Sequence, residues 1–227
     1  MGTEIRILDF YYDAELMEAL HEVFQFIWFP PSTFFISNNL IAAGKVSEAL
    51  EAYVPKQLST FLARHLDSLT ASLQINLDAD GGWELWSRVS GVNSPSFGYL
   101  HIDNDELLRS KDGTIFTPVH GTVLYVGPNQ GIEGGETAFW VSEKPCPQDH
   151  IFTNLPKDEF LPPEFKLVSP RAGRLVVFRG SIPHAVIWAN TTPANPRVTL
   201  LANYWNARIS SVPHGVCSMS PGEYKGD

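Results

Sequence analysis

The residues that follow Gly81-Gly82 limit most strongly what this chain can fold into. From Trp83 onward, eight short apolar runs alternate with breaks rich in glycine and proline, and no helical pattern separates them. Short strands joined by turns, without intervening helices, are typical of a β-sandwich or a β-barrel. The eight runs are WELWSRV, FGYLHI, GTVLYVG, GETAFWV, FKLVSP, GRLVVFRG, HAVIWAN and RVTLLANYW.

Two helical patterns precede these runs. In residues 13–28 apolar side chains recur at steps of three and four, Asp13 is suited to cap the first turn, and a double proline follows the pattern. A second helical pattern covers residues 46–73 and is interrupted at Pro55. His65 lies on the apolar stripe of this second pattern, so we predict a core or boundary histidine there.

The predicted fold class is therefore mainly β with flanking α-helices. We expect a helical support region over residues 1–83, a β core over 84–206 and a tail or flap over 207–227, all within a single structural domain. The segment 141–164 is rich in proline and charged residues, which indicates an insertion between strands.

Composition excludes several classes of function. The chain has 227 residues and a net charge of −9, whereas proteins that coat nucleic acids carry a basic face. Cys146 and Cys217 form no metal-binding or disulfide pattern. The N-terminal residues lack a secretory pattern, and the most apolar window, VFQFIWFPP, is too short to cross a bilayer. We therefore expect a cytoplasmic protein without a membrane or nucleic-acid partner.

His101 and Asp103 stand two positions apart in the stretch GYLHIDND. Residues at i and i+2 of a strand project from the same face, so the pair suits a surface hydrogen bond, a base with its orienting acid, or two ligands of one metal. A third residue favours the metal, because His184 opens a late apolar run of the same β half. Two histidines and one carboxylate form the facial triad of iron(II) oxygenases, which leaves coordination positions open.

Arg197 and Thr199 also alternate on one predicted strand. If this face points into the protein, the guanidinium needs an anion, because an unpaired buried charge is costly. A ligand carboxylate held by Arg197 and the Thr199 hydroxyl would meet that need. A metal site together with a carboxylate site suggests that the ligand is a 2-oxo acid.

These residues carry a family resemblance over about residues 84–206. The chain resembles the prolyl-4-hydroxylase-like branch of the iron(II)/2-oxoglutarate dioxygenases. Four motifs follow one another in the order found in that family: HID at 101–103, TVLYVGPNQGIEGGETAF at 122–139, SPRAGRLVVFRGSIPHAV at 169–186 and RVTLLANYW at 197–205. The resemblance implies a double-stranded β-helix, or jelly roll, with the N-terminal helices packed outside it.

The resemblance also implies the cofactors and the site residues. His101, Asp103 and His184 would bind Fe(II), and Arg197 with Thr199 would bind 2-oxoglutarate, which is consumed together with O2. Family members often carry a tyrosine for the co-substrate about ten residues before the HxD motif, and this chain has none there. Tyr99 and Tyr125 are candidates to replace it, and core packing is the alternative role for both.

Related halogenases carry a small residue in place of the carboxylate, so Asp103 favours hydroxylation, desaturation or cyclisation. Substrate identity stays open between a small amino-acid-like or secondary-metabolite molecule, which we favour, and a prolyl residue in a peptide. A non-catalytic cupin-like metal-binding module is a further alternative, which Arg197 and Thr199 disfavour. Nucleic-acid demethylases of the superfamily typically carry a second arginine six residues after the first. This chain has Asn203 at that position, which disfavours a nucleic-acid demethylase.

Overall fold

The structure, a computed structural model, describes most of the chain as two compact units. Among the described residues no helix is both long and apolar enough to cross a membrane. Unit 1 comprises residues 1–28, 87–103 and 120–201, and unit 2 comprises residues 29–86, 104–119 and 202–227. The described residues are 4–9, 11–26, 33–78, 80–90, 100–128, 133–144, 146, 163–187, 189–190, 196–210 and 216–219.

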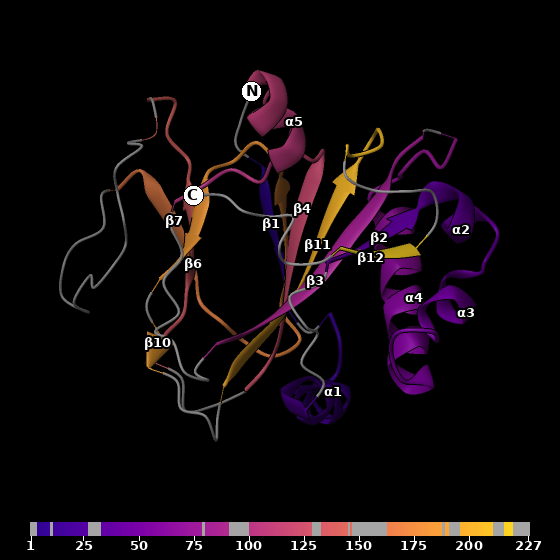
Figure 1. The fold of residues 1–227 in the computed structure, drawn as a ribbon. Helices are drawn as coiled ribbons and strands as arrows, with labels where there is room; N and C mark the ends of the chain where they lie inside the picture. The colour runs from indigo at the N-terminus through magenta and orange to yellow at the C-terminus, as the bar shows by residue number, and fades with distance from the viewer. Residues whose placement is uncertain are drawn as a thin grey trace. The chain divides into compact units, whose positions relative to one another are not determined.

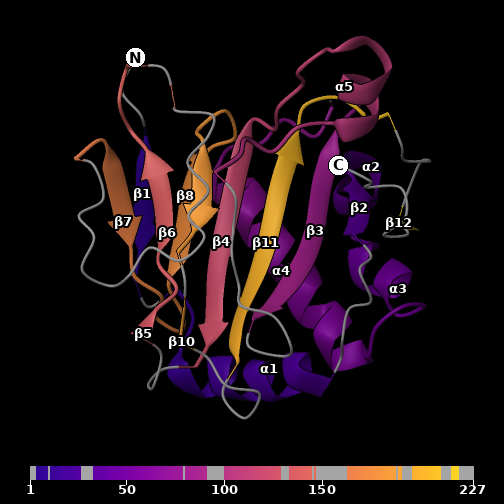
Figure 2. The same cartoon turned by 60° about the vertical axis from the view of Figure 1, so that its left-hand side comes forward.

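Among its described residues, unit 1 is built from antiparallel strands and helix α1 (Figures 1 and 2). Strand β8 pairs with β1 on one side and β4 on the other, while β6 pairs with both β7 and β9. A short two-stranded sheet joins β5 and β10. The elements are β1 (Ile5–Leu8), α1 (Ala14–Phe26), β4 (His120–Gly127), β5 (Glu133–Gly134), β6 (Thr137–Trp140), β7 (Phe165–Val168), β8 (Leu175–Arg179), β9 (His184–Val186) and β10 (Ala189–Asn190).

The core of unit 1 lies between the sheet of β1, β8 and β4 and the sheet of β7, β6 and β9. Val123 and Tyr125 of β4 pack with Phe139 of β6, Val168 of β7 and Phe178 of β8, and all five side chains are buried. Residues 123 and 125 are two positions apart, so they share the inward face of β4. Complete burial of each such side chain contributes about 1.5 to 3 kcal/mol to the free energy of folding. This core fixes the inner faces of both sheets.

Helix α1 covers β4 and confirms the first predicted helix to within two residues at each end. Asp13 caps it as predicted, since its carboxylate accepts a hydrogen bond from the Leu16 amide at 2.8 Å. The buried His21 on this helix donates from Nε2 to the Pro196 carbonyl at 2.9 Å. That bond ties the helix to the residue just before β11 (Arg197–Trp205).

Unit 2 combines helices with strands, and its second predicted helix is confirmed together with its interruption. The pattern divides into α3 and α4, and Pro55 stands directly before α4. His65 is fully buried, and burial lowers its pKa to about 3, so it is the neutral core histidine that the sequence predicts. The elements are β2 (Thr33–Ser37), α2 (Asn38–Ala42), α3 (Val46–Leu50), α4 (Lys56–Ser72), α5 (Glu106–Asp112) and β12 (Val216–Met219).

Strands β3 (Gly82–Ser90) and β11 each contain residues of both units and are neighbours in one sheet. In unit 2, β3 pairs with β2, which pairs with β12. The indole of Trp83 donates to the Thr70 hydroxyl of α4 at 3.1 Å, while the indole of Trp205 donates to the Glu84 carboxylate at 3.1 Å. Trp83 and Glu84 are adjacent, so these two bonds mark the opposite faces of β3.

Helix α5 corrects the expectation that no helix interrupts the β half. It has no buried residue and therefore no apolar periodicity that the sequence could reveal. Its ends are defined instead by local contacts: Asp105 accepts from the Leu108 amide, and Gly113, at a φ of 76°, closes the C-terminus. The run FGYLHI is a further difference, because His101 forms an isolated bridge and residues 97–99 lie outside the described part.

Replacing Asp105 by alanine is expected to destabilise unit 2 by about 2 to 4 kcal/mol, because a buried carboxylate that accepts three hydrogen bonds is lost. Its oxygens accept from the Leu108 amide at 3.1 Å and from the Ser210 amide and hydroxyl at 2.6 and 2.8 Å. Urea unfolding measures the change. The control is Asp112→Ala, which removes an exposed carboxylate bonded to Thr114, and equal stability of the two variants would contradict the prediction.

Candidate metal centre

His101 and His184 are held opposite each other by the backbone of unit 1. The His101 amide donates to the His184 carbonyl at 3.0 Å, and the His184 amide donates back to the His101 carbonyl at 2.8 Å. This reciprocal pair is an antiparallel bridge, whose two side chains lie on the same face. The two imidazole rings accordingly lie with centroids 4.6 Å apart.

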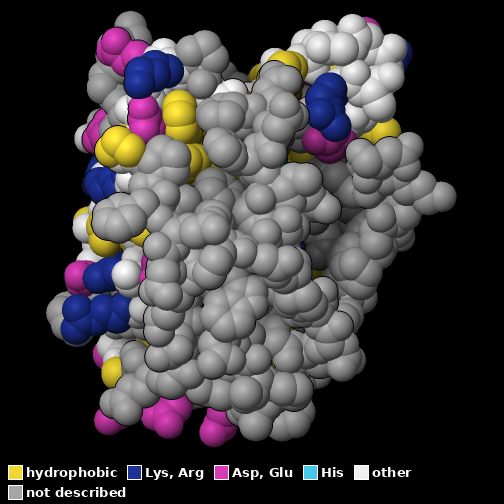
Figure 3. Space-filling view, turned by 90° about the vertical axis from the view of Figure 1, so that its left-hand side faces the viewer, with side chains coloured by type: hydrophobic (Ala, Val, Ile, Leu, Met, Phe, Trp, Pro, Cys, Tyr) yellow, Lys and Arg dark blue, Asp and Glu magenta, His cyan; other side chains and the backbone are white. Residues whose placement is uncertain are grey.

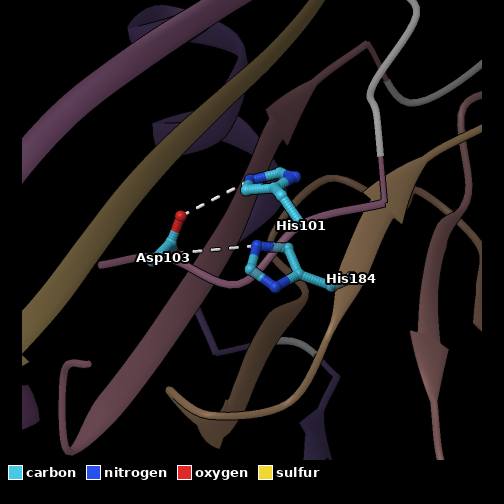
Figure 4. A group of neighbouring side chains, drawn as sticks. All are labelled: His101, Asp103 and His184. Atoms are coloured by element: carbon cyan, nitrogen blue, oxygen red, sulfur yellow. Dashed lines mark ion pairs between the residues drawn. The ribbon is translucent and has the colours of Figure 1, made fainter. Parts of the chain in front are cut away.

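Asp103 completes a cluster of three donor side chains that point toward one another (Figure 4). Its two oxygens lie 3.4 Å from Nε2 of His101 and 3.6 Å from Nε2 of His184. One ligand atom from each residue lies within 4.8 Å of the others, and among the described residues this is the one group of three or more such donors. Ligand atoms that share an ion at about 2.1 Å lie about 3 Å apart, so small adjustments would let the three residues bind one ion.

His184 is oriented by a second hydrogen bond. Its Nδ1 lies 3.0 Å from the Ile182 carbonyl, and because a carbonyl only accepts, the proton is on Nδ1. The Nε2 lone pair therefore faces Asp103, as in metal-binding histidines whose other nitrogen is held by the protein. Burial lowers the pKa of His184 and outweighs the opposing effect of Asp103, which favours the neutral, metal-binding form. The Phe178 ring packs edge-on against the imidazole.

Exposure differs sharply across the cluster. The His184 side chain is 8% exposed and that of Asp103 is 17% exposed, whereas the His101 side chain is 46% exposed. The cluster is therefore buried at His184 and exposed to solvent at His101. A bound ion would keep positions accessible to further ligands, which the 2-His-1-carboxylate arrangement provides.

Arg197 lies inside unit 1, with 1% of its surface exposed. Its Nε has no hydrogen-bond partner, and no carboxylate of the described residues forms an ion pair with the guanidinium. The guanidinium carbon lies 5.2 Å from the ring centroid of Tyr125. Burial lowers the pKa of Arg197 and outweighs the opposing effects of Tyr125 and of the more weakly acting Glu136 carboxylate. A buried cation in this state is suited to accept an anionic ligand.

Thr199 and Tyr125 lie near Arg197, and both hydroxyl groups have protein partners. The buried Thr199 hydroxyl makes a long bond of 3.5 Å to the Arg88 carbonyl. The Tyr125 hydroxyl donates to the Val168 carbonyl at 3.2 Å and lies 2.6 Å from Oγ1 of Thr137. Tyr125 contacts Arg197 both through its ring and through a side-chain hydrogen bond that raises the pKa of Arg197, while its part in binding the co-substrate stays a prediction. Tyr99 lies outside the described residues.

Charged side chains of both signs lie on the described surface. On the face drawn in Figure 3, described Lys and Arg side chains are interspersed with Asp and Glu side chains rather than gathered in one broad basic area. Among the described residues, Arg174 forms an ion pair with Asp9 at 2.6 Å, and Lys144 forms one with Glu164 at 2.8 Å.

Comparisons with known proteins find similarity at the level of structure. No protein-family model and no curated protein sequence matches the chain. A prolyl-4-hydroxylase from Pseudomonas putida is similar at a TM-score of 0.51 and 18% identity, over 91% of this chain and 89% of that one. HygX from Streptomyces hygroscopicus with nickel and 2-oxoglutarate bound is similar at a TM-score of 0.52 and 16% identity, over 90% and 83% of the two chains. Its iron-bound form gives a TM-score of 0.51 at 16% identity over the same shares.

These structures share the architecture that the sequence resemblance implies. The antiparallel sheets of unit 1 and the flanking helices agree with it. The two structures also match 91% and 90% of this chain. The prediction of a mainly β jelly roll with flanking helices is confirmed. The chain has the fold of the iron(II)/2-oxoglutarate oxygenases, including that of a prolyl-4-hydroxylase.

Proposed function

We propose that this chain is an Fe(II)/2-oxoglutarate-dependent dioxygenase that oxidises a C–H bond of a small amino-acid-like or secondary-metabolite substrate. The observation that carries the proposal is the convergence of His101, Asp103 and His184, whose donor atoms lie within 4.8 Å of one another. The fold is one in which HygX binds nickel and 2-oxoglutarate, and also iron. We further propose a cytoplasmic location, without a membrane or nucleic-acid partner.

His101, Asp103 and His184 would hold the iron. Two neutral imidazoles and one carboxylate are a donor set that suits Fe(II) and leaves three of six positions for other ligands. When bound, iron(II) supplies the activation of O2, coupled to the decarboxylation of 2-oxoglutarate to succinate and CO2. The Ile182 carbonyl keeps the proton of His184 on Nδ1, so that Nε2 stays available for the metal.

Arg197 would bind the far carboxylate of 2-oxoglutarate. Its guanidinium can donate two parallel hydrogen bonds to one carboxylate, and no described carboxylate forms an ion pair with it. Thr199 would add its hydroxyl, exchanging the long bond to the Arg88 carbonyl for a shorter one. The ring of Tyr125 beneath the guanidinium would keep Arg197 in place.

A prolyl residue of a peptide is the second candidate substrate. It is favoured by the similarity to the prolyl-4-hydroxylase from Pseudomonas putida, which covers 89% of that protein. This similarity concerns the fold. Hydroxylation, desaturation and cyclisation of the substrate are all compatible with an aspartate at position 103.

Coupled measurement of succinate and O2 tests the proposal. Protein loaded with Fe(II) under reducing conditions is given 2-oxoglutarate together with a panel of free amino acids and short proline-containing peptides. We expect succinate to form in step with O2 uptake, and faster with one class of the panel than with 2-oxoglutarate alone. Metal binding without any 2-oxoglutarate turnover, with or without the panel, would instead support the cupin-like module.

A further inference from the structure

Strand β3 carries a second arginine whose side chain shares a face with the Glu84 carboxylate. Successive side chains of a strand point to opposite faces, so Arg88, four residues after Glu84, projects from the same side of β3. The bond from Trp205 to Glu84 shows that this is also the face of Trp205 on β11. The other face is that of Trp83, which bonds to helix α4.

The same alternation places Arg197 on this face. Arg197 and Thr199 precede Trp205 by eight and six residues in the uninterrupted strand β11. Strands β3 and β11 are neighbours in the sheet, and the Thr199 hydroxyl bonds to the Arg88 carbonyl at 3.5 Å. Arg88 and Arg197 therefore project from adjacent strands toward the same side of unit 1.

The surroundings of the two arginines differ. Arg197 is buried, whereas the Arg88 side chain is exposed. Neighbouring protein atoms nevertheless desolvate the Arg88 guanidinium enough to lower its pKa. Arg88 also lowers the pKa of Arg197, which places the two like charges within electrostatic range of each other.

Arg88 has no acid to balance it in the described part of the chain. No ion pair joins its guanidinium to a carboxylate of the described residues. The weaker charge of Glu136, which raises the pKa of Arg197, has no such effect on Arg88. An exposed guanidinium that forms no ion pair with a described carboxylate is suited to bind an anion.

The identity of that anion follows from the proposed function, on which this inference rests. 2-Oxoglutarate has two carboxylates, and in that function one binds the metal and the other binds Arg197. No co-substrate anion is left for Arg88. We propose that Arg88 binds a carboxylate of the primary substrate, so that the enzyme acts on acids in preference to their uncharged amides.

Matched acids and amides test this assignment by binding rather than by turnover. The probes are N-acetyl-L-proline, N-acetyl-L-glutamate and N-acetyl-L-leucine, each beside its carboxamide, titrated calorimetrically into the protein loaded with Mn(II) and 2-oxoglutarate. We expect at least one acid to bind about tenfold or more tightly than its amide, as a charge-assisted pair provides. Arg88→Gln should abolish this preference, and Arg88→Lys should keep part of it.

The control variant is Arg171→Gln, which removes an exposed arginine 3.9 Å from Asp9 and should leave every affinity unchanged. An acid preference that survives in Arg88→Gln, or its absence throughout the panel, would overturn the assignment. Weaker 2-oxoglutarate binding in Arg88→Gln would also overturn it, because Arg88 would then belong to the co-substrate site. Failure of the wild type to bind 2-oxoglutarate would reject the proposed function instead, and the acid preference can still be read with Mn(II) alone.

Discussion

Asp103→Ala is expected to abolish turnover and to weaken Mn(II) binding by at least about 100-fold, because even outer-shell contacts are worth 10- to 100-fold in metal affinity. The carboxylate is the one anionic donor of the cluster, and it lies within 3.6 Å of both imidazoles. Its removal leaves two neutral nitrogens, which bind hard divalent ions poorly. His184→Ala should have the same effect, since it removes the best-buried donor.

Calorimetric titration with Mn(II) and succinate formation measure the two effects, and circular dichroism checks that the fold is kept. The matched control is His120→Gln, which alters a half-buried histidine of the same unit outside the cluster. Wild-type metal affinity or full turnover in Asp103→Ala or His184→Ala would refute the site. If both variants fail to fold, Asp103→Asn tests the site instead, because asparagine keeps the side-chain volume and removes the charge.

Arg197→Met is expected to remove 2-oxoglutarate binding and yet leave the protein without co-substrate as stable as the wild type, or more stable by about 1 to 3 kcal/mol. The reason is that the guanidinium is buried without an acidic partner, so replacing it with an apolar side chain of similar length removes a desolvation cost. This combination distinguishes a ligand-binding arginine from a structural one. A structural arginine would lose stability when replaced.

Thermal unfolding of the Mn(II)-loaded proteins measures both parts. Ligand at 100 times its Kd stabilises the wild type by about 2.7 kcal/mol, and the variant should gain nothing at the same concentration. Arg171→Met serves as control, because Arg171 is exposed. If Arg197→Met keeps the wild-type response to 2-oxoglutarate, Arg197 does not hold the co-substrate.

The features that the sequence predicts best depend on local chemistry. Asp13, Pro55 and the apolar periodicity of the helices define α1, α3 and α4 closely, since caps, prolines and a repeat of 3.6 residues act over a few positions. Helix α5 has no such repeat, because it buries none of its side chains. Strands β1 and β2 are also missing from the predicted runs, because a strand of four or five residues carries too short a pattern.

Part of the candidate site could also be predicted, because some of its residues form local sequence patterns. The i, i+2 spacing of His101 and Asp103 and the alternation of Arg197 and Thr199 are visible in the sequence. The hydrogen bond from His184 to the Ile182 carbonyl is not visible in the sequence, because every residue has a backbone carbonyl and none stands out as the acceptor. Arg88 left a weak signal, a charged residue four positions after Glu84 in an otherwise largely apolar strand.

Anomalous diffraction from crystals soaked with Mn(II) tests the central claim most directly, since every role proposed above requires one ion among His101, Asp103 and His184. We predict a single strong peak in bonding distance of both imidazole Nε2 atoms and one oxygen of Asp103. A peak bound elsewhere, or none between these three side chains at a saturating concentration of Mn(II), would contradict the account.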